Sequence, residues 1–170
     1  AKQTVRYTLR RGAAAVYEPP FTFQGFRYVA IEGFPGPLTS DSLAGIVVHS
    51  DMAPAGTFET SKPLVNQLQH NIVWGQRGNF LEVPTDCPQR DERLGWMGDA
   101  QIYARTATYN ADVAAFFTKW LDDVAEAQRD SGAYPDYCPY PFAHGASGAT
   151  HGTAWTDAGV AKETIVSGGK

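Results

Sequence analysis

The sequence has little cysteine and no long apolar run. Its 170 residues include 2 cysteines, Cys87 and Cys138, too few for a disulfide framework and without the spacing of a zinc site. We therefore expect both thiols to be reduced and structural. No stretch reaches roughly 18 consecutive apolar residues, so the sequence excludes a transmembrane helix and we expect no membrane partner.

An excess of charge of one sign is also absent. The formal net charge is −4, which excludes the strongly basic surface of a nucleic-acid-binding protein. A hydrophobic content of 43% and a charged content of 19% are ordinary for a globular chain long enough for one domain or parts of two. Residues 1–6 contain neither an initiator methionine nor the apolar core of a signal peptide. We expect the true N-terminus to be absent, so the sequence assigns this soluble protein neither to the cytoplasm nor to secretion.

The first 59 residues have the pattern of β-strands. Alternating, β-branched and aromatic runs cover residues 5–9, 21–23, 26–32 and 46–50, with proline- and glycine-rich turns between them. We expect an antiparallel, sandwich-like β-segment over residues 1–59. Because these strands are too few to close a sandwich, they indicate a piece of a larger assembly.

From residue 60 onward the pattern becomes helical, which makes the predicted fold class α+β. Ser61 predicts an N-cap and Pro63 a first turn. A second helix is predicted over residues 98–108. The apolar positions assigned to these two helices are Leu64, Val65, Leu68 and Ile72 in the first and Ile102, Tyr103 and Ala107 in the second.

The third predicted helix, residues 113–127, has the clearest apolar stripe. Asn110 is its predicted cap, and the spacing places Phe116, Phe117 and Trp120 in the core. Residues 132–152 are rich in aromatic residues, proline and glycine, and such long loops are typical of the walls of a binding pocket.

The segment from Asp86 to Asp99, called the signature segment below, holds four carboxylates, two arginines and one tryptophan. A solvated network of salt bridges is one explanation, with each pair contributing about 0–1 kcal/mol. A site for a polyhydroxylated ligand is the other, since carboxylates and arginine bind hydroxyls and tryptophan stacks on a sugar ring. Glycoside hydrolysis also needs a carboxylic acid that stays protonated. The residues alone leave Asp86, Asp91, Glu92 and Asp99 all open as that proton donor.

Residues 86–100 closely resemble, without a gap, the signature of the bacterial α-L-rhamnosidases of glycoside hydrolase family 78 (Asp-Cys-Pro-Gln-Arg-Asp-Glu-Arg-Leu-Gly-Trp-x-Gly-Asp-Ala). Residues 21–28 resemble the last β-domain before the family's catalytic barrel, and residues 155–160 resemble a later barrel motif. The resemblance covers about residues 15–160. It implies that residues 60–160 form the N-terminal part of an (α/α)6 barrel and that residues 161–170 are an unmatched tail.

The resemblance also implies roles for single residues. Glu92 matches the family's general acid, and the family inverts the anomeric configuration. The family's general base is a glutamate far downstream, so we expect the base to lie outside this truncated chain and do not assign it to Glu163. The residues that the resemblance implies as contacts of the rhamnose are Asp86, Arg90, Trp96, Asp99 and Trp155.

Two functions of different classes therefore remain open. The first is a glycoside hydrolase that removes terminal α-L-rhamnose from small-molecule or oligosaccharide rhamnosides. The second is a non-catalytic carbohydrate-binding remnant, with or without self-association into a homo-oligomer that covers the apolar face of residues 113–127. No cofactor is expected, because the seven-residue spacing of His144 and His151 has no common metal geometry.

Overall fold

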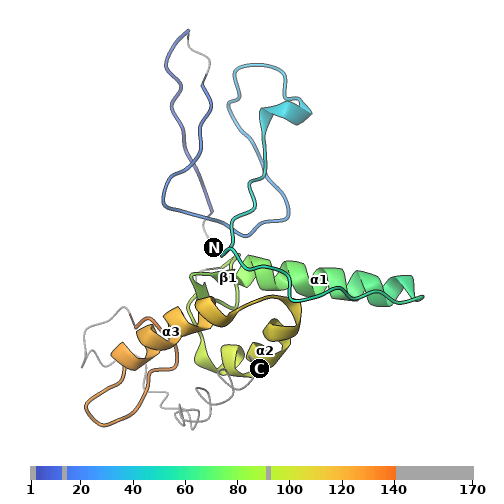
Figure 1. Ribbon diagram of the computed structural model, residues 1–170. Coiled ribbons are helices and arrows are strands. Elements are labelled where there is room, and N and C mark those ends of the chain that lie inside the picture. Colours follow the sequence, from blue (N-terminus) through green and yellow to red (C-terminus); the bar gives the residue numbers. More distant parts are fainter. Residues whose placement is uncertain (1–2, 13–14, 91–92, 141–170) are drawn as a thin grey trace.

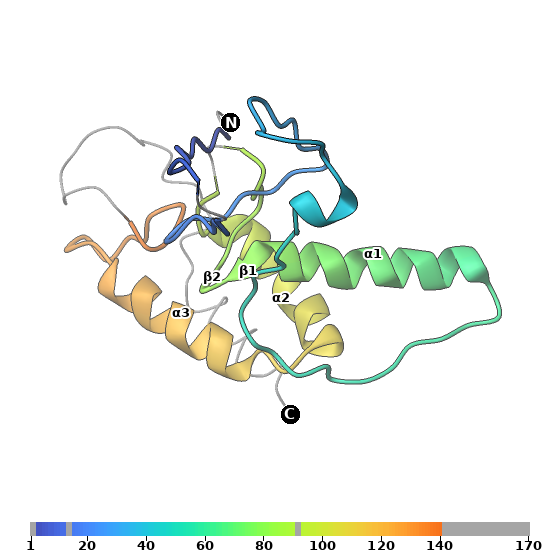
Figure 2. The same cartoon turned by 90° about the horizontal axis from the view of Figure 1, so that it is seen from above.

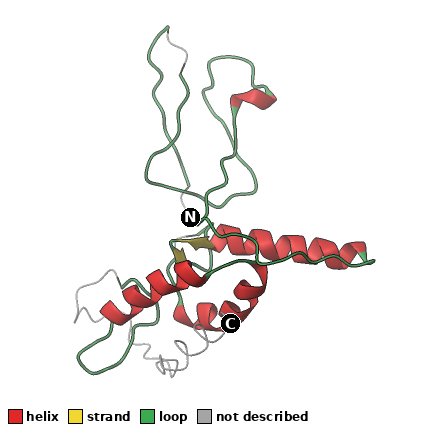
Figure 3. Cartoon of the chain, viewed as in Figure 1, coloured by secondary structure: helices red, strands yellow, loops and turns green. Residues whose placement is uncertain are grey.

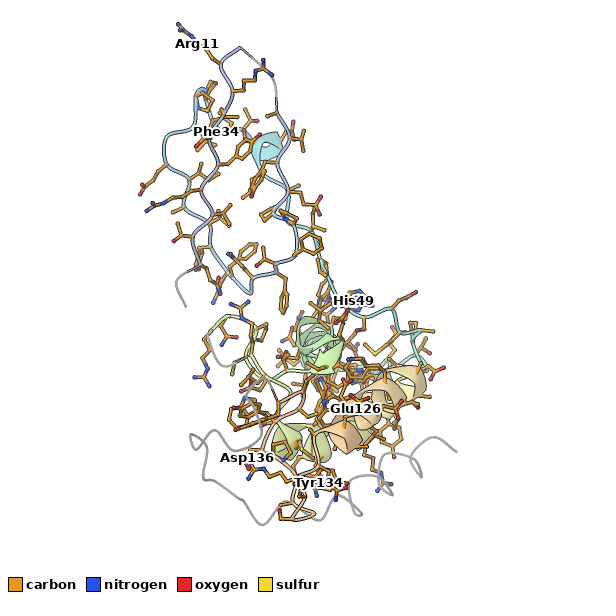
Figure 4. The ribbon with its side chains drawn as sticks, turned by 90° about the vertical axis from the view of Figure 1, so that its left-hand side faces the viewer. Arg11, Phe34, His49, Glu126, Tyr134 and Asp136 are labelled. Carbon is orange, nitrogen blue, oxygen red and sulfur yellow. The ribbon has the colours of Figure 1, made fainter. Side chains whose placement is uncertain are left out.

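The computed structural model describes residues 3–12, 15–90 and 93–140. Its N-terminal part, up to about residue 48, consists of long extended loops with one short 3-10 helix, η1 (Ser40–Ser42). A helical part begins with α1 (Pro63–Asn79) (Figure 1). Figure 4 shows Arg11 and Phe34 at the far end of the N-terminal part, His49 near the junction, and Glu126 in the helical part.

The expected β-segment is not confirmed. Within the described part of residues 1–59, the predicted strands are extended but form no ladder, and Figure 3 shows this region as loop except for η1. The alternating side chains are solvent-exposed, for example Val5 (48%), Tyr7 (49%) and Leu9 (43%). A strand is stabilised by a paired neighbour and by cover over its apolar face. Apart from the single bond from the Ser50 N–H to the Phe80 carbonyl, the predicted strands have no paired neighbour among the described residues and their apolar faces are uncovered, which explains why no ladder forms here.

Helix α1 begins at Pro63 as predicted, because a proline at the first helical position loses no intrahelical hydrogen bond. The predicted cap is wrong: the N-cap is Lys62, whose N–H donates to Thr60 Oγ1 at 3.1 Å. The side chain of Asn66 closes this turn, since its Oδ1 accepts the Thr60 N–H at 2.8 Å. The predicted inward stripe is also wrong in its first half, where Leu64 is 85% and Leu68 is 58% exposed.

A two-stranded antiparallel hairpin that the sequence analysis did not predict follows α1. Strands β1 (Phe80–Leu81) and β2 (Val83–Pro84) turn at Glu82, which has a φ of 62°. The earlier segment holds this turn, because the Glu82 N–H donates to Ser50 Oγ at 2.9 Å and the Ser50 N–H donates to the Phe80 carbonyl at 2.9 Å. The hairpin thus joins the end of α1 to the chain that descends from the N-terminal part.

Helices α2 (Met97–Asn110) and α3 (Ala114–Glu126) complete the helical part, with α2 lying between α1 and α3 in both views (Figures 1 and 2). The buried face of α2 consists of Met97 and three alanines. Because alanine side chains are small, the aromatic rings of Phe80, Phe116 and Phe117 fit in the same core. Phe80 stacks on Phe116 at a centroid distance of 4.6 Å. The buried core consists of Phe80, Met97, Ala100, Ala104, Ala107, Val113, Phe116, Phe117, Trp120, Val124 and Cys138.

The structure therefore confirms the core positions predicted in α3 and, in α2, confirms Ala107 in the core with Tyr103 partly buried against it. Ile102, expected to face the core, is 73% exposed. Asn110, expected to cap α3, is the last residue of α2, and Val113 is the N-cap of α3. The Asn110 side chain instead donates to Gln76 Oε1 at 2.9 Å and to the Tyr103 hydroxyl at 3.3 Å. It thereby ties α2 to α1.

Both cysteines are free, as expected, and Cys138 is fully buried. Over the described ranges, no helix has the length and apolar character needed to cross a bilayer.

Candidate active site

The end of α1 and the β1–β2 hairpin place the first residue of the signature segment. After β2, the chain returns to α1 because the backbone N–H and the hydroxyl of Thr85 both donate to the Asn79 carbonyl at 2.9 Å. Thr85 is buried, so these bonds are shielded from water. They fix the backbone immediately before Asp86.

Asp86 has a carboxylate oxygen that is buried without a partner. Its Oδ1 is the one buried side-chain oxygen or nitrogen without a hydrogen-bond partner among the residues that the structure describes. Leaving a buried polar atom unpaired costs about 1–3 kcal/mol, and more for a charged group. Such an atom is typical of a site whose partner arrives with a ligand.

Asp86 lines a cleft of about 920 Å³ between the end of α1, the start of α2 and the loop at residues 134–137. This volume falls within the range of about 300–1,000 Å³ that is usual for ligand pockets. Most of the lining is apolar or aromatic, with a few carboxylates and amides. The side chains that line the cleft and carry polar or aromatic groups are Gln76, Asn79, Phe80, Thr85, Asp86, Trp96, Asp99, Tyr103, Tyr134, Asp136 and Tyr137.

Trp96 is held in the cleft by backbone pairing between two distant segments. It forms an isolated antiparallel bridge with Tyr137, and the two rings meet edge to face at a centroid distance of 5.0 Å. On either side, the Met97 N–H donates to the Asp136 carbonyl at 2.9 Å and the Cys138 N–H donates to the Gly95 carbonyl at 2.8 Å. The wall around Trp96 is therefore fixed by main-chain hydrogen bonds.

Gly95 is required by this close pairing. A Cβ at this position would overlap the carbonyl oxygen of Cys138 and approach the indole nitrogen of Trp120 to 3.2 Å. That carbonyl also accepts the indole N–H of Trp120 at 2.9 Å, in a buried hydrogen bond. Trp120 of α3 thus supports the same loop from behind.

Asp99 lies in the first turn of α2 and lines the cleft, although its side chain is exposed. A carboxylate there is stabilised by the partial positive charge of the helix N-terminus, typically by about 0.3–1 kcal/mol. The helix end therefore explains part of the preference for an acid at this position. Its place on the wall of the cleft leaves the carboxylate available to a ligand.

Arg90 is exposed and does not line the cleft. Its backbone N–H donates to the Cys87 carbonyl at 3.3 Å, which closes a turn just after Asp86. A hydrogen bond from the Cys87 thiol to Asp86 raises the pKa of that thiol, and burial and the charge of Asp86 add to the increase, while Arg90 opposes it. Arg90 thus lies close enough to Cys87 to act on its thiol, and neither residue lines the cleft.

The structure therefore brings Asp86, Trp96 and Asp99 to one cleft and leaves Arg90 outside it. Glu92 and Trp155, like His144 and His151, lie outside the described residues. Among the described residues, no group of three or more histidine, cysteine or acidic side chains is arranged to hold a metal ion.

The sequence analysis predicted that the loop after residue 132 walls a pocket, and residues 134–137 do line the cleft. It did not single out Asp136 or Tyr137. Figure 4 shows Tyr134 and Asp136 in the helical part, and both line the cleft. Burial raises the pKa of Tyr137, as do its neighbours Tyr140 and Asp136, so its hydroxyl stays protonated at neutral pH. The mixture of tyrosines and Asp136 between two prolines was the signal available in the sequence.

Comparison with known proteins decides the family. Residues 53–163 match the bacterial alpha-L-rhamnosidase 6 hairpin glycosidase domain. Residues 1–49 match the concanavalin-like domain of the same enzymes. The chain belongs to the bacterial α-L-rhamnosidase family. The predicted resemblance is confirmed, and the helical part belongs to a six-hairpin glycosidase domain.

Individual rhamnosidases agree with this assignment. The alpha-L-rhamnosidase of Streptomyces avermitilis is 50% identical over 162 residues, and one from Formosa agariphila is 45% identical over 141 residues. The solved structure of the Streptomyces avermitilis enzyme complexed with L-rhamnose superposes with a TM-score of 0.70 at 53% identity, covering 73% of this chain and 12% of that one. The native enzyme of Aspergillus terreus gives a TM-score of 0.71 at 48% identity, covering 76% of this chain and 15% of that one.

The matched region is a small part of these relatives. This chain aligns over 94% of its own length with the Streptomyces avermitilis enzyme and over 82% with that of Formosa agariphila. In each case it spans about 15% of the relative's length. The comparisons therefore establish the family, while activity and substrate belong to the proposal below.

Proposed function

We propose that this protein is a glycoside hydrolase that removes terminal α-L-rhamnose from glycosides by inverting acid/base hydrolysis. Glu92 is the proposed general acid and protonates the departing glycosidic oxygen. In an inverting reaction, a second carboxylate roughly 6.5–9.5 Å away activates water on the opposite face of the sugar. We assign no residue of this chain to that general base. The family assignment supports the reaction class.

The observation that carries the proposal is the buried, unpartnered Oδ1 of Asp86 on the wall of the cleft. An ionised carboxylate accepts hydrogen bonds only, and sugar hydroxyls donate them. A hydroxyl placed against this oxygen would remove the penalty for leaving it unpaired. We therefore propose that Asp86 binds hydroxyl groups of the rhamnose ring.

The rest of the cleft suits the other chemistry of a 6-deoxy sugar. Its methyl group needs apolar contact, and the ring faces carry C–H groups that pack on aromatic rings. Trp96 and Tyr137 provide such surfaces near Asp86. Asp99 is the second proposed hydroxyl-binding carboxylate of the cleft. Arg90 and Trp155 remain proposed ligands of the same sugar on the family resemblance alone.

A specific observation also favours a second candidate. The described cleft places Asp86 and Trp96 on its wall, and no residue of this chain is assigned as the general base. A protein with this wall alone would bind rhamnose and not cleave it. In that case Asp86 and Trp96 keep their proposed roles, and Glu92 has no catalytic one.

An aryl α-L-rhamnoside tests both candidates, because it reports turnover by colour and binding by calorimetry. We expect turnover by the wild-type protein, its loss in Glu92→Gln, and normal activity in the matched control Glu126→Gln at the exposed end of α3. Binding without turnover would select the second candidate. Neither binding nor turnover would refute both.

Asp86→Asn separates binding from folding. Loss of a charged hydrogen-bond acceptor costs about 1.5–3 kcal/mol, or roughly 10–100-fold in affinity. We expect this loss in rhamnose affinity with no decrease in the free energy of unfolding, because the buried Oδ1 of Asp86 makes no hydrogen bond that the substitution could remove. The matched control is Asp130→Asn, an exposed residue outside the cleft. A loss of stability with unchanged affinity would contradict the proposed role of Asp86.

A further inference from the structure

Two lengths of the chain far apart in sequence meet beside the cleft. The N-terminal residues Gln3, Phe23 and Gly25 each contact the signature segment, and they do so on both sides of positions 91 and 92. Pro88 and Gln89 are contacted before these positions and Arg93 after them. The contacts are specific, as the geometry of each one shows.

Arg93 makes two contacts with Phe23. Its guanidinium donates from Nη1 to the Phe23 carbonyl at 2.8 Å, and its central carbon lies 5.5 Å from the centre of the Phe23 ring. A hydrogen bond fixes the distance between the two segments, and the packing over the ring fixes the plane of the guanidinium. A lysine at this position would keep the charge and one donor and lose the planar fork.

Gly25 makes the second attachment, backbone to backbone. Its N–H donates to the Pro88 carbonyl at 3.3 Å. A Cβ on Gly25 would lie 2.9 Å from the Gln89 nitrogen, closer than real Cβ atoms approach, and 3.0 Å from the Pro88 carbonyl carbon, which is also a tight contact. The side chain of Gln3 adds a third contact, with Nε2 donating to the Gln89 carbonyl at 2.8 Å.

These contacts stand out because the surrounding N-terminal part is otherwise loosely packed. Over residues 3–12 and 15–48, nearly every residue is exposed, and Phe21 and Val16 are 108% and 101% exposed. Gln3, Phe23 and Gly25 are among the few that are half-buried. The N-terminal part has no core of its own, so the partial burial of these three residues comes from their contacts with the signature segment. We infer that attachment to this segment is their role.

We propose that Gln3, Phe23 and Gly25 brace the signature segment and that Arg93 is the positioning residue of this brace. The effect on catalysis rests on the proposed function, because Glu92 directly precedes Arg93 in the chain. Asp86 is fixed independently, since Thr85 holds it to α1 through Asn79. Loosening the brace therefore acts on the segment after Pro88 and spares the sugar-binding carboxylate.

The test compares Arg93→Met and Gly25→Ala with matched controls in the full chain. Arg27→Met removes an arginine that lies over the exposed Tyr28 ring in the same N-terminal part. Gly36→Ala adds a methyl group where nothing lies within 4 Å. The first measurement is amide hydrogen exchange at Gly25 and Arg90, whose N–H groups are bonded to Pro88 and Cys87. It requires no catalytic activity.

We expect exchange at these amides to accelerate at least about tenfold in Arg93→Met and Gly25→Ala, with exchange in α2 and in both controls unchanged. Rhamnoside hydrolysis then gives the catalytic consequence. A misplacement of about 1 Å costs about 100-fold in rate, so kcat should fall by that order while KM stays within about threefold, because Asp86 keeps its position. Arg93→Lys should restore part of both signals.

Unchanged exchange at Gly25 and Arg90 in Arg93→Met would overturn the brace, as would an equal acceleration in Arg27→Met. A parallel rise in KM and fall in kcat would overturn the positioning role. If the wild-type protein does not turn over rhamnoside, the proposed function fails, and the amide exchange data still show whether the brace exists. If Gly25→Ala does not fold, the exchange rates in Arg93→Met answer the same question.

Discussion

Replacing Gly95 with alanine should destabilise the protein strongly, because the added methyl group overlaps a backbone oxygen. That oxygen, on Cys138, cannot rotate away as a flexible side chain would. It already accepts the indole N–H of Trp120 at 2.9 Å, while the Cys138 N–H donates to the Gly95 carbonyl at 2.8 Å. The segments must separate to admit the methyl group, and both hydrogen bonds weaken when they do.

The magnitude follows from these contacts. Overpacking a buried position costs about 1–3 kcal/mol, and a buried hydrogen bond that loses its partner costs about 1–3 kcal/mol. If one of the two bonds breaks, the two contributions add, and Gly95→Ala should lower the free energy of unfolding by about 2–6 kcal/mol. For a chain of this size, this corresponds to a fall of roughly 10 °C in melting temperature.

Urea unfolding followed by tryptophan fluorescence measures the change, with Gly78→Ala as the control. Gly78 lies within α1 with nothing inside 4 Å of its Cβ position, so alanine there should be neutral or stabilising by up to about 1 kcal/mol. An unfolding free energy for Gly95→Ala within about 0.5 kcal/mol of the wild type would refute the reasoning. The pairing of residues 95 and 138 would then not be the contact that holds this loop.

Two further predictions concern the same loop. Trp120→Phe leaves the Cys138 carbonyl without its indole donor and should lower the unfolding free energy by about 1–3 kcal/mol in urea; an unchanged value would show that the bond does not contribute. Burial raises the pKa of the Cys138 thiol from 9.0 to about 12. The folded state therefore holds this proton more tightly than the unfolded state, so the stabilisation is complete below pH 9 and is lost as the pH rises towards 12. Between pH 9 and pH 12, the free energy of unfolding should fall by at most about 1.4 kcal/mol per pH unit in the wild type and less steeply in Cys138→Ala. Equal slopes in the two proteins would show that the Cys138 thiol does not have a raised pKa.

The buried face of a helix could be predicted from the spacing of its apolar residues only where those residues are large. In α3, aromatic residues at helical spacing marked the buried face, and Phe116, Phe117 and Trp120 are indeed in the core. In α2 the buried face is formed by alanines, whose weak hydrophobicity is hidden by larger neighbours such as Ile102. Pattern analysis therefore found the right helix and the buried Ala107, but it assigned the exposed Ile102 to the core and missed Ala100 and Ala104.

The β-segment shows a different limit. Alternation predicts which faces of a strand would be buried, but pairing depends on a neighbour that local sequence does not specify. The short hairpin at residues 80–84 shows the reverse case, because strands of two residues carry too little pattern to be found. The bonds from Ser50 to Phe80 and Glu82 that hold it link positions about thirty residues apart.

For the candidate site, the density of charged residues between Asp86 and Asp99 was informative, since Asp86, Trp96 and Asp99 do line one cleft. Asp136 and Tyr137 could not be added from the sequence, because only the folded chain brings them against Trp96. The same holds for Phe23 and Arg93. Their contact depends on how a segment seventy residues away descends onto the helices.

The attachment of residues 134–138 to Gly95 and Met97 consists of main-chain atoms, with Trp120 as its side-chain support. Exchange of the side chains at Tyr134, Asp136 or Tyr137 therefore leaves the anchoring bonds in place. The wall formed by residues 134–137 can therefore change in shape and polarity while its backbone keeps its position. Libraries randomised at these three positions, with glycine kept at 95, would therefore alter the lining of the cleft without removing the main-chain bonds that anchor it.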